Sequence, residues 1–269
     1  MIPHREIAAA KLNLALHVRG ELPDGRHAIE TVFAFCVDGD RLTADPADKL
    51  SLTASGPFAR DLPESKDNLV LRAARALQEA SGVAHGAVIH LDKQLPVASG
   101  VGGGSADAAA TLRLLTSLWH IDPAHAAAVA PTIGSDVPAC LISLSARGEG
   151  AGDRLELVDP AGITGTPVLL ANPRAALSTA EVFARWNGID QGPVEDWREG
   201  QNGLEPAATE LVPQIQTVMA WLTAQPGANL VRLSGSGATC FALFDSVEQR
   251  DRATEAVPRE WWHLATSLR

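Results

Sequence analysis

The sequence lacks several features that mark whole classes of protein. Its three cysteines, Cys36, Cys140 and Cys240, stand far apart with no CxxC pair. This spacing excludes a zinc ribbon or a disulfide framework and predicts buried free thiols. No run of about 18 apolar residues is present, so no transmembrane helix is expected. Residues 1–10 contain His, Arg and Glu and no apolar core of a signal peptide, so we expect a cytoplasmic protein.

Positive charge and some aromatic residues are also scarce. The chain has 22 Lys and Arg against 32 Asp and Glu, a net charge of −10. Binding to nucleic acid without sequence preference needs a basic surface, so this class is disfavoured, although a few local cations can still bind an anionic small ligand. Tyrosine is absent. Lysine occurs only at positions 11, 49, 66 and 93, so each lysine requires an explanation.

The 269 residues are enough for one large domain or two smaller ones, and 46% of them are apolar, as in ordinary soluble proteins. A chain of this length buries enough surface to fold without disulfides or a structural metal. The composition shifts around residues 146–153, which are rich in small and charged residues. We therefore expect one domain over residues 1–150 and a second over residues 151–269.

Hydrophobic periodicity predicts a mixture of helices and strands without strict βαβ alternation, which indicates an α+β protein with two lobes. The apolar and polar residues of 11–18 alternate, which predicts a half-buried strand with Lys11 and Asn13 on one face. Other expected strands are 31–37, 41–44, 50–53, 87–91, 141–145, 155–158, 168–171, 231–233, 239–244 and 264–268. Expected helices are 69–80, 105–119, 123–130, 179–186, 205–224 and 247–257, with a loop over 133–138.

The strongest local motif covers residues 100–109, where four glycines precede a helical pattern. Glycines free the backbone N–H groups to converge, and the helix start adds unpaired N–H groups and the positive end of the helix dipole. The motif therefore predicts a phosphate site. No lysine follows the glycines, which excludes a P-loop. A dinucleotide fingerprint would need glycine at Ser105, so a nicotinamide oxidoreductase is a weaker alternative.

Three further motifs are ambiguous when each is taken alone. Asp136 stands in a short loop between Gly134-Ser135 and Val137-Pro138, where an aspartate is more often a turn or cap residue than a catalytic one. Residues 233–238 form a glycine-rich segment between two expected strands and suit a hairpin turn or a ligand loop equally well. Lys11 and Asn13 suit a solvated strand edge or a binding face.

In chain order, these motifs resemble those of the GHMP small-molecule kinases. The resemblance is closest to the branch that phosphorylates the 2-hydroxyl of a cytidyl diphosphate sugar alcohol in non-mevalonate isoprenoid synthesis. It spans most of the chain, through residues 10–14, 23–27, 67–69, 92–96, 102–105, 133–138, 202–206 and 234–238. It implies the two-lobed GHMP kinase fold, with an N-terminal mixed α/β ATP lobe, a C-terminal ferredoxin-like α/β lobe and the active site in the cleft between them.

The resemblance also implies a reaction with ATP and Mg²⁺. Asp136 would act as the general base, and Lys11 would lie beside it, keep it ionised and stabilise the nucleophilic oxygen. Ser105 is the one side chain that we name for Mg²⁺. The ATP-binding residues implied by the family motifs are Asn68, Leu69, Lys93, Pro96, Gly100, Gly102, Gly103, Gly104, Ser105 and Ala106.

Recognition of the cytosine base departs from the family pattern. Arg26 occupies the position where the family carries an aromatic residue that stacks on the base. A guanidinium plane can also stack on a base, so we hypothesise that Arg26 and Phe183 enclose the cytosine. The full set of expected substrate-binding residues is Asn13, Arg26, His27, Thr179, Phe183, Gly235 and Ser236.

We expect a small-molecule substrate, no nucleic acid, no membrane, and a monomer or weak homodimer. Two alternatives remain within the same fold. The chain could phosphorylate another small alcohol, such as homoserine or mevalonate, or it could be a non-catalytic nucleotide-binding protein.

Overall fold

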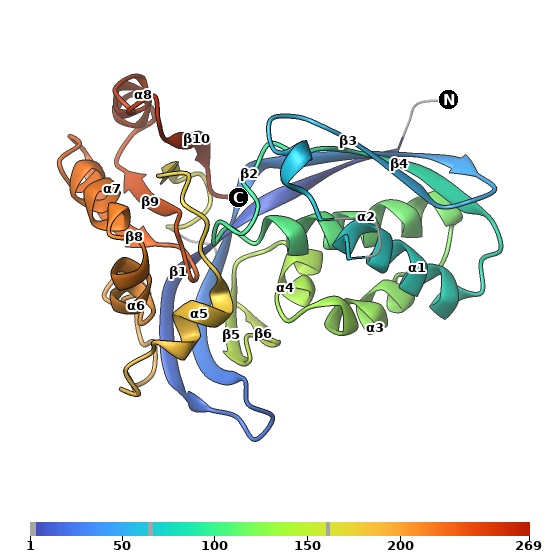
Figure 1. The fold of residues 1–269 in the computed structure, drawn as a ribbon, viewed down its shortest axis with the longest axis horizontal. Coiled ribbons are helices and arrows are strands. Elements are labelled where there is room, and N and C mark those ends of the chain that lie inside the picture. Colours follow the sequence, from blue (N-terminus) through green and yellow to red (C-terminus); the bar gives the residue numbers. More distant parts are fainter. Residues whose placement is uncertain (1–3, 64–66, 160–161) are drawn as a thin grey trace. The chain divides into compact units, whose positions relative to one another are not determined.

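The computed structural model describes residues 4–63, 67–159 and 162–269 (Figure 1). The chain forms two compact units: unit 1 comprises Met1–Ala10, Asp38–Val97 and Gly102–Ser143, and unit 2 comprises Lys11–Val37, Ala98–Val101 and Leu144–Arg269. The long strands β1 (His4–Glu21) and β2 (His27–Ala47) therefore contribute one end to each unit. The division of the chain at residue 150 stays a prediction.

Unit 1 combines strands with a layer of helices (Figure 1). The second half of β2 pairs antiparallel with β4 (Gly86–Asp92), and β3 (Ser51–Ser55) pairs parallel with β4. A 3₁₀ helix, η1 (Ala59–Asp61), follows β3. The helices are α1 (Leu69–Ser81), α2 (Gly103–Trp119), α3 (Pro123–Ile133) and α4 (Val137–Ile142), and they pack on one another.

Unit 2 contains the first half of β2 paired with β5 (Ala146–Gly150), which pairs with β6 (Arg154–Leu157). Its second sheet is antiparallel in the order β10-β7-β9-β8, from Trp262–Ser267, Pro167–Asn172, Cys240–Phe244 and Ala228–Leu233. In chain order these strands are 4-1-3-2, the order of a ferredoxin-like lobe, as expected. The helices are α5 (Thr179–Ala184), α6 (Glu205–Leu211), α7 (Gln214–Thr223) and α8 (Val247–Glu255).

Several expected elements are confirmed with longer or shifted ends. Helix α1 begins where Asn68 Oδ1 accepts a hydrogen bond from the Val70 N–H at 2.9 Å, and it ends at Gly82 in the left-handed region. The expected strands 31–37 and 41–44 are parts of the single strand β2. The three cysteines are buried thiols that form no disulfide, as predicted.

Four expectations are wrong. Residues 141–145 do not form a strand, because α4 continues to Ile142. Pro138 in the first turn of α4 favours the start of this helix. Val137 and Pro138 therefore belong to α4 and not to the loop expected over 133–138. The helix expected over 205–224 is divided into α6 and α7 because Pro213 follows Val212, which has a φ of −132° and a ψ of 83°. Strand β1 is not half-buried, since every residue from Ala8 to Val18 is buried.

No helix within the described part of the chain combines the length and the hydropathy that a membrane crossing requires.

Candidate active site

The glycine-rich motif forms the start of α2 in unit 1. Gly102 is the N-cap residue with a φ of 65°, a left-handed conformation that favours glycine, and Gly103 and Gly104 form the first turn. The N–H groups of a first helical turn have no partner within the helix and suit an anion. Ser105 is half-buried in the same turn, and the Ala106 N–H donates to the Gly102 carbonyl at 2.8 Å. The motif thus lies at the N-terminus of a helix, and phosphate binding there stays a prediction.

Two of the other expected ATP-binding residues in unit 1 lie against these glycines. A Cβ atom on Gly104 would lie 3.3 Å from Leu69 Cδ1, and one on Gly103 would lie 3.1 Å from Lys93 Nζ. Asn68 is buried beside Leu69 and caps α1, so its side-chain oxygen is already committed to the Val70 N–H. Pro96 is buried a short distance along the chain from Lys93. The fold therefore brings Leu69 and Lys93 to the glycine-rich turn.

Lys93 is the centre of a buried ion cluster. Its Nζ donates to Asp40 Oδ2 at 2.5 Å and to Asp107 Oδ2 at 2.6 Å. Burial raises the pKa of Asp107 to about 8, against the lowering effect of Lys93 and with a further rise from Asp40. Burial alone would lower the pKa of Lys93, but the two carboxylates raise it. The Lys93 ammonium is thus committed to carboxylates of its own unit, and its contact with ATP stays a prediction.

The expected catalytic lysine lies in unit 2, in a buried hydrogen-bonded chain on β1 and β2. Lys11 Nζ donates to Asn13 Oδ1 at 3.0 Å, which confirms that the two side chains share a face. The Asn13 amide donates to Thr31 Oγ1 at 2.8 Å, and the Thr31 hydroxyl donates to the Ala15 carbonyl at 2.6 Å. Lys11 Nζ also lies 4.6 Å from the centre of the Phe33 ring, within range of a cation–π interaction.

The turn between β8 and β9 lies close to Asn13. Ser234 Oγ donates to the Gly100 carbonyl at 2.9 Å. A Cβ atom on Gly100 would lie 2.3 Å from the backbone carbonyl oxygen of Ser234, so only glycine fits. A Cβ atom on Gly235 would lie 3.4 Å from Asn13 Oδ1. The hydroxyls of Ser236 and Thr179 are 2.9 Å apart. Of the expected substrate residues, Gly235 therefore lies beside Asn13, and Ser236 lies beside Thr179.

The structure places His27 against Phe183. The two ring centres are 4.7 Å apart with an angle of 29° between the planes, and Trp186 contacts His27 edge-on at 5.5 Å. Arg26 is exposed and forms an ion pair with Asp24 at 2.8 Å, which lowers the pKa of Asp24 through the Arg26 side-chain hydrogen bond. The ring that stacks on Phe183 in this structure is that of His27, and the enclosure of cytosine by Arg26 and Phe183 stays a hypothesis.

Asp136 lies at the N-cap position of α4 and is partly exposed, without a side-chain cap bond to the helix. Within the described ranges, no group of three or more His, Cys, Asp or Glu side chains is arranged to hold a metal ion. Ser105, the one side chain expected to bind Mg²⁺, lies in the first turn of α2, and its role stays a prediction. Its hydroxyl is an oxygen ligand of the kind that Mg²⁺ takes, and Mg²⁺ otherwise keeps several waters and binds mostly through substrate phosphates.

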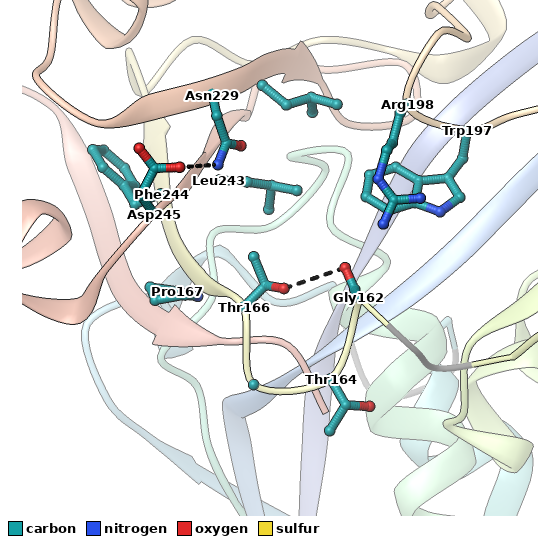
Figure 2. A pocket seen from close by; sticks show the side chains of 12 residues that line it. Gly162, Thr164, Thr166, Pro167, Trp197, Arg198, Asn229, Leu243, Phe244 and Asp245 are labelled. Atoms are coloured by element: carbon teal, nitrogen blue, oxygen red, sulfur yellow. Dashed lines mark hydrogen bonds between the residues drawn. The ribbon is translucent and has the colours of Figure 1, made fainter.

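A separate cavity of about 660 Å³ lies in unit 2 and is lined by none of the expected site residues. Figure 2 shows Arg198 over Trp197 on one side and the hydrogen-bonded pair of Asn229 and Asp245 on the other. Arg232 is buried and donates to the carbonyls of Leu14, Trp197 and Arg198. The side of the cavity formed by Trp197 and Arg198 is therefore held by one buried guanidinium.

Sequence reasoning gave no role to several residues that shape these clusters. Asp40 and Asp107 hold Lys93, and Thr31 orients Asn13. Asn202 donates to the carbonyls of Leu233 and Gly235 at 2.8 and 2.7 Å and so fixes the glycine turn. Asn202 had a signal in the sequence, since it begins a segment that resembles the kinase family, and Asp107 lies within the glycine-rich motif of residues 100–109.

Known proteins match the chain along most of its length. The family model of the GHMP kinases N terminal domain matches residues 68–143, and that of the GHMP kinases C terminal domain matches residues 188–264. The 4-diphosphocytidyl-2-C-methyl-D-erythritol kinase of Rhizorhabdus wittichii is 50% identical over 98% of this chain and 94% of its own length. The protein of that name from Novosphingobium aromaticivorans is 48% identical over 98% and 93%.

Solved structures agree in fold. A 4-(cytidine 5'-diphospho)-2C-methyl-D-erythritol kinase superposes with a TM-score of 0.81 at 32% identity, over 98% of each chain. The mevalonate kinase of Methanococcus jannaschii has a TM-score of 0.70 at 10% identity, again over 98% of each chain, and so shows the fold alone. The chain belongs to the GHMP kinase family and is a small-molecule kinase with an alcohol acceptor. Within that family it falls in the branch of the 4-diphosphocytidyl-2-C-methyl-D-erythritol kinases.

Proposed function

We propose that the chain transfers the γ-phosphoryl group of ATP to the 2-hydroxyl of 4-diphosphocytidyl-2-C-methyl-D-erythritol. The full-length similarity to kinases of that name is the observation that carries the proposal. The glycine-rich start of α2 and the Lys11–Asn13 pair support it, because phosphoryl transfer depends mainly on positioning and on stabilising negative charge.

The proposed roles at the reacting atoms belong to two side chains. Asp136 accepts the proton of the attacking hydroxyl, and Lys11 stabilises the negative charge that develops on that oxygen. Asn13 contacts the substrate from the Lys11 face. The hydrogen bonds from Lys11 and to Thr31 fix the orientation of the Asn13 amide, so it meets the substrate without first losing rotational freedom.

ATP occupies the glycine-rich turn in this proposal. The N–H groups of Gly102, Gly103, Gly104 and Ser105 hold its phosphates, and Ser105 supplies the hydroxyl for Mg²⁺, which neutralises phosphate charge when bound. The adenine side is lined by Asn68, Leu69, Lys93 and Pro96, with Gly100 and Ala106 flanking the loop. The cytidyl diphosphate contacts Arg26, His27, Thr179, Phe183, Gly235 and Ser236.

A substrate panel tests this assignment. ADP formation is measured with 4-diphosphocytidyl-2-C-methyl-D-erythritol, homoserine and mevalonate at equal ATP and Mg²⁺. We expect kcat/KM for the cytidyl substrate to exceed that of the other two by at least about 100-fold, because sites built for polar groups reject substrates that lack them. Comparable rates with homoserine or mevalonate would contradict the substrate, and no ADP with any of them would contradict the kinase role.

A further inference from the structure

Three rings are packed together in unit 2. His27 is the first residue of β2, and its imidazole stacks on the Phe183 ring with the ring centres 4.7 Å apart and 29° between the planes. The Trp186 indole meets the same imidazole at 5.5 Å and 90°. Offset-stacked and edge-to-face contacts are the favoured arrangements of aromatic pairs. The imidazole is therefore packed against one ring on its face and against a second ring that is perpendicular to it.

Phe183 and Trp186 come from one turn of the chain at the end of α5. They are three residues apart, a spacing that places two side chains on the same side of a helical turn. The Trp186 N–H donates to the Phe183 carbonyl at 3.0 Å, so the turn continues past Ala184, the last residue of α5. Val182 is fully buried in the core of unit 2, and both rings pack against that core. The position of the indole is thus fixed by the backbone and by the core.

The ring nitrogens of His27 are not used by the fold. His27 is half-buried, and among the described residues neither of its ring nitrogens has a hydrogen-bond partner. In the same unit, His17 has both nitrogens committed, Nδ1 to the Gly192 carbonyl and Nε2 to the Gln201 N–H. A neutral imidazole presents one N–H donor and one acceptor nitrogen, and the edge of a nucleobase offers groups that match both. The His27 imidazole is therefore available to a ligand.

We propose that Trp186 is a positioning residue for cytosine recognition, because it fixes the plane of the His27 imidazole. This inference rests on the proposed function. The last torsion of a histidine side chain has broad energy wells, so the rotamer alone does not fix the ring plane. The Phe183 ring restrains one face of the imidazole, and the perpendicular indole restrains rotation out of that stack. The imidazole then presents its donor and its acceptor in one orientation, which discriminates against a base with a different pattern of donors and acceptors.

The test compares Trp186→Leu, which removes the ring, with Trp186→Phe, which keeps an aromatic ring at that position. The KM for the cytidyl substrate is measured at saturating ATP, and the KM for ATP at saturating cytidyl substrate. We expect Trp186→Leu to raise the first by roughly two- to tenfold, the scale of one aromatic pair, with kcat and the KM for ATP unchanged. Trp186→Phe should recover most of this loss. An unchanged KM for the cytidyl substrate in Trp186→Leu would overturn the proposal.

Trp261 offers a matched control. It also makes a perpendicular ring contact in unit 2, with Trp221 at 5.7 Å and 88°, and it is likewise half-buried against the core. Trp261→Leu therefore removes an equal ring at a comparable site. We expect its KM for the cytidyl substrate to match that of the wild type. The same rise in KM in Trp261→Leu as in Trp186→Leu would indicate a general loosening of unit 2 and would overturn the proposal.

A binding measurement separates this inference from the proposed reaction. The Kd is measured for cytidine 5'-diphosphate and for uridine 5'-diphosphate, with the ATP site filled by a non-hydrolysable ATP analogue. We expect the wild type to prefer the cytidine compound, Trp186→Leu to lose severalfold of that preference, and Trp261→Leu to keep it. Equal preference in the wild type and Trp186→Leu would overturn the role of Trp186. Absence of ADP formation from the cytidyl substrate would instead refute the proposed reaction, and the Kd ratios would still decide the role of Trp186.

Discussion

The side chain of Asn13 is held in one orientation by Thr31. The Thr31 hydroxyl donates its hydrogen to the Ala15 carbonyl at 2.6 Å. It can therefore only accept from Asn13, whose amide nitrogen lies 2.8 Å away. The Asn13 oxygen must then face the Lys11 ammonium, at 3.0 Å. A buried threonine thus determines which atom of Asn13 meets the proposed catalytic lysine.

Replacing Thr31 tests this arrangement. Thr31→Val keeps the shape but removes the acceptor, which leaves the buried Asn13 amide unpaired. We expect a loss of about 1–3 kcal/mol in the free energy of unfolding and a fall of roughly tenfold in kcat/KM through misorientation of Asn13. Thr31→Ser keeps the hydroxyl and serves as the matched control. Equal activity of the valine and serine variants would show that the orientation of Asn13 does not matter.

The stacking of His27 on Phe183 leads to a prediction about base recognition. Phe183→Leu retains an apolar side chain but removes the aromatic plane. We expect the KM for the cytidyl substrate to rise by roughly tenfold, in keeping with about 1–3 kcal/mol for a stacked base, with the KM for ATP unchanged. Arg26→Ala, measured in parallel, tests the hypothesised guanidinium stack. An unchanged KM in the Arg26 variant would assign base recognition to His27 and Phe183 without Arg26.

Arg232 provides a prediction about stability. Its guanidinium is buried and donates to three backbone carbonyls, including that of Arg198 at 2.6 Å. Arg232→Ala would leave these acceptors unpaired, so we expect the free energy of unfolding, measured by urea titration, to fall by about 3 kcal/mol. The exposed Arg198→Ala is the control and should change stability by no more than about 0.5 kcal/mol. Similar losses in both variants would contradict the structural role of Arg232.

The raised pKa of Asp107 makes the stability of the protein depend on pH. Its carboxyl has an ordinary pKa of 3.8 and a pKa of about 8 when folded, so the folded state binds the proton more tightly than the unfolded state. The stabilisation from this proton is complete below about pH 4 and is lost as the pH rises through about 8. We expect the wild type to lose stability relative to Asp107→Asn between pH 5 and pH 9 in paired unfolding titrations. A constant difference would show that Asp107 ionises normally.

Local signals in the sequence were sufficient for the elements that carry the phosphate turn. Asn68 and Gly82 mark the ends of α1, and the glycines mark the start of α2, because caps and left-handed residues act over a few positions. The same local reasoning failed at α4. A short apolar segment after Pro138 suits a strand or a helix equally, and only packing against other helices decides between them.

The partners of the buried polar groups could not be predicted from the sequence. Asp40 and Lys93 are 53 residues apart, and Asn13 and Thr31 are 18 apart. Such pairs depend on strand register and on the docking of α2, which periodicity does not specify. The sequence therefore indicated Lys93 as an ATP-binding candidate but not the two carboxylates that hold it. In the same way, the family pattern indicated Arg26 as the residue that stacks on the base beside Phe183, whereas the structure places the His27 ring against Phe183.

The proposed substrate and the proposed general base are tested most directly by one measurement. It follows ADP release from ATP and Mg²⁺, with and without 4-diphosphocytidyl-2-C-methyl-D-erythritol, for the wild type and Asp136→Asn. We expect ADP from the wild type only when the cytidyl substrate is present. The variant should lose at least about 100-fold in kcat, the scale expected for removal of a general base, while its Tm stays close to that of the wild type. Full activity in Asp136→Asn would contradict the proposed role of Asp136. ADP release that is independent of the cytidyl substrate would contradict the proposed substrate.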